Sequence, residues 1–130
     1  MTVSHATSAR TAATDAVTAL LGTNARLKFH PTGATLATPG TVLANLPLTA
    51  TANGGFSTGG ATATAGAITS DTAAVAGTVA AATLQTSGAV AIILCAVAAS
   101  GSDINMSNGL VLATNDTVAC SSLTYTALPQ

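Results

Sequence analysis

Charged side chains are so scarce in this chain that most of its surface must be neutral. Only 5% of the 130 residues are charged, whereas 48% are hydrophobic, and the sequence contains neither Glu nor Trp. In soluble domains about a quarter of the residues are usually charged, and this charge helps to keep the molecules from associating. So little charge is typical of membrane proteins, of disordered low-complexity segments and of subunits covered by other protein. The charged residues are Arg10, Asp15, Arg26, Lys28, Asp71, Asp103 and Asp116.

The distribution of apolar residues argues against the first two classes. The longest unbroken apolar stretch runs from Ala89 to Ala99, well short of the roughly 20 residues that a membrane-spanning helix needs. Residues 1–9 are small and polar, which is not typical of a secretory signal. Disorder requires low hydrophobicity or high net charge, but the net charge is −1. We therefore expect one folded domain without a membrane span, which gains burial by self-association.

A helix is predicted over about Ser8 to Leu21. Apolar residues recur there at spacings of three and four, which places them on one face; they are Ala9, Ala12, Ala13, Ala16, Val17, Leu20 and Leu21. Ser8 is expected to cap the amino end, and Gly22 is expected to end the helix in a left-handed conformation. Residues 1–7 are expected to form an arm that either frays or orders on a neighbouring subunit.

The segment from Ala25 to His30 alternates with a period of two, which predicts a half-buried strand. Leu27 and Phe29 point to one side of it. The other side is basic, and consists of Arg26, Lys28 and His30. This basic face either meets an acidic partner or is a solvated strand face. With three basic Lys and Arg residues in the whole chain, nucleic-acid binding is not expected.

Further strands are predicted at spacings of about ten residues, with turn residues between them. Pro47 cannot donate to a ladder and predicts an edge or a bulge, and Asn53-Gly54 predicts a hairpin turn. The segment 89–98 is apolar on both faces, so it is either central or exposes one face to a second chain. The predicted strands are Val42–Ala50, Ala61–Ile68, Thr78–Gln85, Ala89–Ala98, Ile104–Met106, Leu110–Ala113 and Val118–Thr126.

This series predicts a mainly β fold with one N-terminal helix. Many short strands with regular turn signals are typical of a β-sandwich or a jelly roll. We expect an N-terminal arm at residues 1–7 and a single domain at residues 8–130. Within that domain the helix covers about residues 8–21, and the β-sandwich covers about residues 25–126.

Nothing in the sequence indicates catalysis. The Asp residues are dispersed, and His5 and His30 are far apart, whereas acid–base chemistry needs titratable groups brought together. The phosphate-binding glycine motifs GxGxxG and GxxxxGK[ST] are absent from the sequence. Ser102 to Asn105 could offer oxygen ligands to calcium but lacks the rest of an EF-hand pattern, so a capped turn is expected there. The prediction is a protein without enzymatic activity, cofactor or metal.

Two residue types leave alternatives open. Cys95 and Cys120 lie in apolar, strand-like surroundings with no CxxC pattern, so we interpret them as buried thiols that act as small hydrophobic groups. A single disulfide between neighbouring strands is the alternative.

Sugar-binding surfaces commonly use aromatic platforms, and only Phe29, Phe56 and Tyr125 are aromatic. The sequence therefore gives only weak support for a lectin role.

The order of several short motifs resembles a family of small structural proteins encoded by tailed phages and prophages. The resemblance covers about Arg10 to Thr126. Its motifs are DAVTALL at 15–21, LANLPL at 43–48, AITSDT at 67–72, TSG at 86–88 and SGSDINM at 100–106. Between Ala80 and Ala98 the chain departs from the family pattern, because it lacks aromatic and charged residues there. The resemblance implies a virion structural protein, and most specifically a capsid decoration, or cement, protein.

Such a protein is made in the host cytoplasm and then binds the outer surface of the capsid. Its expected partners are the major capsid protein and further copies of itself, as a dimer or trimer, and its expected role is to stabilise the head. The candidate contact residues are His5, Arg10, Arg26, Lys28 and His30. The alternative is a head-fibre or tail-associated β-domain that binds a host surface glycan.

Overall fold

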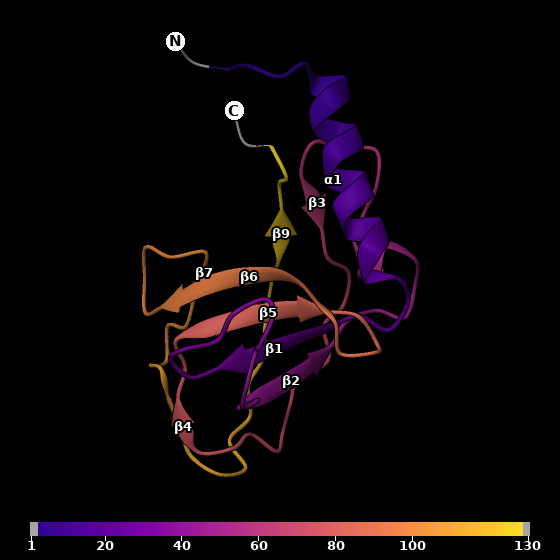
Figure 1. Ribbon diagram of the computed structural model, residues 1–130. Coiled ribbons are helices and arrows are strands. Elements are labelled where there is room, and N and C mark those ends of the chain that lie inside the picture. Colours follow the sequence, from indigo (N-terminus) through magenta and orange to yellow (C-terminus); the bar gives the residue numbers. More distant parts are fainter. Residues whose placement is uncertain (1–2, 129–130) are drawn as a thin grey trace.

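The computed structural model describes residues 3–128 and shows a mainly β chain with one N-terminal helix at one end of a curled sheet (Figure 1). Helix α1 spans Thr7–Leu21. The sheet has the order β2-β1-β5-β6-β7. Its strands are β1 (Arg26–His30), β2 (Ala44–Pro47), β5 (Ala81–Gln85), β6 (Ala91–Ala98) and β7 (Ile104–Asn105).

Two short ladders and a one-turn helix complete the described part. Strand β3 (Ala63–Thr64) pairs with β9 (Thr124–Tyr125), and β4 (Gly77–Thr78) pairs with β8 (Val111–Leu112). The 3-10 helix η1 covers Asn53–Gly55. The prediction of a mainly β chain with one N-terminal helix is confirmed. Several strands are much shorter than predicted. The rest of each predicted segment, rich in small residues and threonines, is irregular backbone between these ladders.

The core lies on the side of the sheet to which Leu27 and Phe29 point. Leu27 is opposite Leu46 on β2 and Leu84 on β5, so three leucines meet across antiparallel strands. Such cross-strand apolar pairs stabilise a sheet. The segments that carry β3, β4, β8 and β9 cover this side and complete one buried cluster. They contribute Ala63, Ala74, Val79, Leu112, Val118 and Leu123 to it.

Pro47 lies in β2, which forms one edge of the sheet, so the predicted edge position is confirmed. The neighbouring segment 68–75 covers this edge. The backbone N–H of Asn45 donates to Asp71 Oδ2 at 2.8 Å, and that of Val75 donates to the Leu43 carbonyl at 2.8 Å. These bonds satisfy backbone groups that would otherwise form an open edge.

The two ends of α1 and the turn at Asn53-Gly54 were predicted from single residues, with mixed results. The predicted Ser8 cap is wrong: Ala6 is the N-cap residue, and no side chain caps the helix there. Gly22 ends the helix with the predicted positive φ, which is 66°. The Asn53-Gly54 hairpin is also wrong. Both residues do have positive φ, but they form η1, which packs against α1 instead of joining two paired strands.

Candidate interaction surfaces

Helix α1 leaves much of the apolar stripe of its sequence exposed. Its buried side chains are Thr14, Thr18 and Leu21. Leu20 is 64% exposed, and three alanines of the predicted apolar stripe are exposed with it. We call the exposed set the outer helix face; it consists of Ala9, Ala12, Ala16 and Leu20. The other members of the stripe are covered, because Leu21 is buried and Ala13 and Val17 are half-buried.

Hydrogen bonds explain why the polar face turns inward. The Thr14 hydroxyl donates to the Ala61 carbonyl at 2.7 Å, and the Ala127 N–H donates back to the Thr14 oxygen at 3.2 Å. The Asn53 side-chain amide donates to the Thr18 hydroxyl at 3.1 Å. Figure 1 shows strand β3 and the loops on either side of it next to α1. Buried loop backbone needs hydrogen-bonding partners, and threonines supply them where alanines cannot.

The basic strand face is divided by the fold. Arg26 and Lys28 are half-buried on the side of β1 away from the core, as the alternation predicts. His30 has no exposed surface, so the expectation that it lies on an outward face is wrong. The loop 31–43 folds back over this end of the sheet, and the Thr41 carbonyl lies 2.8 Å from His30 Nδ1.

A chain of hydrogen bonds fixes the His30 ring. A carbonyl can only accept, so Nδ1 carries the proton that is donated to Thr41. Nε2 lies 2.8 Å from the Thr83 hydroxyl, which also accepts a hydrogen bond from the Gln85 side-chain amide at 2.8 Å. With this tautomer, Nε2 accepts a hydrogen bond from the Thr83 hydroxyl. Each of the three hydrogen bonds then has one donor and one acceptor. This buried cluster of His30, Thr83 and Gln85 holds the loop to the sheet and is not a free contact surface.

The remaining two candidate residues lie at the amino end of the chain. His5 is exposed in the extended segment before α1. Arg10 is half-buried, and its Nε donates to the Leu128 carbonyl at 3.0 Å, which ties the helix to the end of the chain (Figure 1). Of the predicted arm, Met1 and Thr2 lie outside the described residues. The structure therefore places the five candidates in two regions, and whether they contact a partner stays a prediction.

Both cysteines are free and half-buried. Burial raises the pKa of the Cys95 thiol to about 11, with a smaller contribution from the Asp103 carboxylate. Burial also raises the pKa of Cys120, and a hydrogen bond with the Ser122 backbone partly opposes this shift. Raised pKa values keep both groups as thiols at neutral pH, which agrees with the interpretation of inert packing groups.

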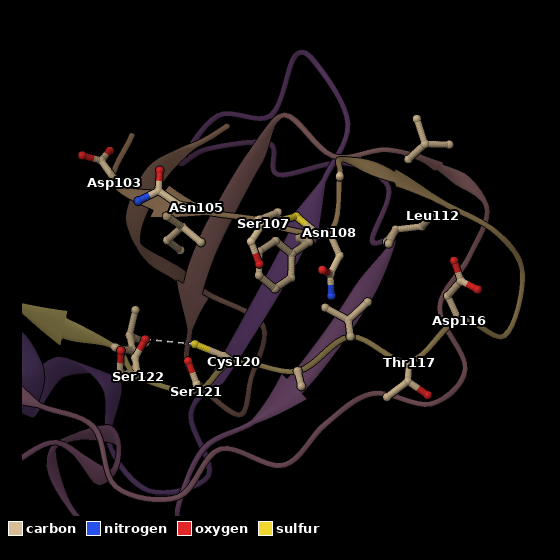
Figure 2. A pocket seen from close by; sticks show the side chains of 18 of the residues that line it. Asp103, Asn105, Ser107, Asn108, Leu112, Asp116, Thr117, Cys120, Ser121 and Ser122 are labelled. Carbon is tan, nitrogen blue, oxygen red and sulfur yellow. Dashed lines mark hydrogen bonds between the residues drawn. The ribbon is translucent and has the colours of Figure 1, made fainter. Parts of the chain in front are cut away.

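An open cleft of about 510 Å³ lies beside the edge strand β7. Its two walls are the segments 103–109 and 116–124, and Figure 2 shows Ser107 and Asn108 on one wall and Thr117, Cys120 and Ser121 on the other. The Asp103 carboxylate accepts a bond from the Ala96 N–H at 2.9 Å, and Asn105 Oδ1 accepts from the Ser102 N–H at 3.0 Å. The expected capped turn is thus present at the bend before β7, whereas Ile104 and Asn105 themselves form that strand.

The outer helix face and the cleft were not among the predicted contacts. The spacing of the alanines can be read from the sequence, but the side of the helix that packs against the rest of the protein cannot.

No family model matches the chain, and neither a curated protein nor a solved structure matches it. Within residues 3–128, no helix is long and apolar enough to cross a membrane, and no group of three potential metal-ligating His, Cys, Asp or Glu residues occurs.

Proposed function

We propose that the chain is a capsid decoration protein that docks on the major capsid lattice through the outer helix face. The observation that carries this proposal is that α1 buries Thr14 and Thr18 while four apolar residues of its stripe stay exposed. A helix on the surface of a free domain normally buries its apolar stripe and presents its polar side to water. Here the hydroxyl face is buried, and an uncharged face with Leu20 at its end remains exposed.

The size of this surface suits weak, repeated binding. A helix of 15 residues is about 22 Å long at about 1.5 Å per residue. Alanines allow the backbone of a partner to approach closely, and the face carries no charge that would have to be desolvated. A standard interface buries about 800 Å² on each partner, so α1 would supply its centre and neighbouring loops its rim. Binding to the assembled lattice then stabilises that lattice by mass action.

Two finer features belong to the same proposal. We propose that the body is an irregular β-sandwich, in which the five-stranded sheet is one layer and the β3–β9 and β4–β8 ladders contribute to the other. Further copies of the chain are the second expected partner. Leu94 on β6 is 40% exposed, and this supports the earlier alternative in which β6 exposes one face to a second chain. Sedimentation velocity would measure the predicted dimer or trimer.

Co-sedimentation with expanded capsids that lack this chain tests the docking proposal. The purified protein should bind saturably, and the variant Ala12→Lys/Ala16→Lys should lose binding because it places two charges in the interface. Lysine is a good helix former, so the variant should keep its thermal midpoint. Ala76→Lys, at an exposed alanine outside α1, is the matched control and should bind normally. Capsid binding by the double variant at wild-type affinity would overturn the proposed surface.

A further inference from the structure

The cleft between segments 103–109 and 116–124 combines an apolar floor with polar walls that are mostly uncharged. Its lining includes Phe29, Leu112 and Val118, all of which are buried core residues. The upper walls carry hydroxyl and amide groups that face solvent. A volume of about 510 Å³ lies within the range of roughly 300–1,000 Å³ that is usual for small-molecule sites.

The polar groups of the walls are available to a ligand. The side chains of Ser107, Asn108, Thr117 and Ser121 are exposed, and they make no hydrogen bond to any other residue in the range 3–128. Together they offer several donors and acceptors over a short distance. A ligand that bound there would exchange water for these groups without breaking any hydrogen bond within the described part of the protein.

The charges around the cleft narrow the class of ligand. No Arg, Lys or His lines it, so nothing there would neutralise a phosphate or a carboxylate. Asp103 and Asp116 line it, and Figure 2 shows them at opposite ends of the cleft, too scattered to form a cation site. A ligand with many neutral hydroxyl groups and one apolar face fits this lining, and these are the properties of a saccharide ring.

The walls are held in place before any ligand binds. Asp103 Oδ2 accepts from the Ala96 N–H at 2.9 Å, and Asp116 Oδ2 accepts from the Ala113 N–H at 2.8 Å. Val118 pairs with Asp71 through two backbone bonds. Fixed walls reduce the ordering entropy that binding would otherwise cost.

We propose that this cleft binds a neutral saccharide of one or two rings. The apolar floor contacts the less polar face of a ring, and Ser107, Asn108 and Ser121 exchange hydrogen bonds with its hydroxyl groups. Because Phe29 forms part of a closed floor, it packs against the ring by contact and does not offer the open aromatic platform that is common in lectins. The cleft involves no residue of the outer helix face, so saccharide binding is independent of capsid docking.

A titration of ¹⁵N-labelled full-length protein tests this proposal, with glucose, galactose, mannose, rhamnose and N-acetylglucosamine as the probes. At least one sugar should cause saturable amide shifts confined to residues 103–109 and 116–124. Asn108→Ala should weaken that binding about tenfold, as expected for the loss of one to two hydrogen bonds. Ser70→Ala, at an exposed serine outside the cleft, should bind like the wild type.

Two results would overturn the saccharide site. One is the absence of saturable shifts with every sugar of the panel. The other is saturable binding that the Asn108→Ala and Ser107→Ala variants leave unchanged although both remain folded. Capsid co-sedimentation of the same variants separates the two proposals, because a cleft variant should still dock on capsids.

Discussion

Replacing Thr83 by valine should destabilise the protein strongly, although the change is nearly isosteric. The Thr83 hydroxyl is the only atom that links the His30 ring to the Gln85 amide among the described hydrogen bonds. His30 and Thr83 have no exposed surface, and Gln85 is 2% exposed. Thr83→Val therefore leaves two polar groups, His30 Nε2 and Gln85 Nε2, in a region that water does not reach.

The expected loss can be estimated from these two groups. A buried polar group that loses its partner costs about 1–3 kcal/mol, and two such groups would cost about 2–6 kcal/mol. The added methyl group recovers about 0.8 kcal/mol by burial. We therefore expect the free energy of unfolding to fall by about 1–5 kcal/mol, a large part of the stability of a domain this size.

Urea unfolding followed by circular dichroism measures this change, with Thr78→Val as the matched control. Thr78 is exposed on β4, and its side chain makes no hydrogen bond to residues 3–128, so its replacement should shift stability by at most about 0.5 kcal/mol. A double-mutant cycle of Thr83→Val with Gln85→Met should show a coupling of about 0.5–3 kcal/mol. Equal effects of the two valine substitutions would refute the role given to the buried cluster.

Three further outcomes are expected. In the folded state the pKa of Cys95 is raised to about 11, so the thiol of the unfolded chain ionises at lower pH than that of the folded protein. The thermal midpoint should therefore fall as the pH rises from about 9 to 11. The variant Cys95→Ala should show a smaller fall over the same range. Thr14→Val should lower the free energy of unfolding in urea by about 1–3 kcal/mol, and Thr11→Val, in the same helix, should not. Gly54→Ala should lower the thermal midpoint more than Gly40→Ala: both positions have positive φ, but only at Gly54 would the new Cβ lie 2.8 Å from neighbouring side-chain atoms.

Local patterns in the sequence predicted the parts of the fold that depend on local chemistry. The alternation from Arg26 to Phe29 gave the correct faces of β1, and Pro47 marked an edge strand. Gly22 marked the end of the helix. Each of these signals acts through a single residue or a period of two, so no distant partner is needed to interpret it.

The errors concern residues whose environment is made by distant segments. Thr14 lies on the same helix as the exposed Ala16, and the hydrogen-bond partner that favours its inward position is a carbonyl 47 residues away. His30 continues the basic face of β1 in sequence, but the loop 31–43 covers it. That loop has no apolar periodicity that would indicate packing against the sheet. The cleft is similarly built from two segments that meet only in the folded chain.

The central proposal requires that a virus encodes this chain, and a cryo-EM reconstruction of that virus's particle tests it most directly. We predict density of this size on the outer surface of the major capsid lattice, with α1 against the lattice and Ala12, Ala16 and Leu20 at the contact. Density at a vertex or tail alone, or copies on the shell whose outer helix face points to solvent, would contradict it.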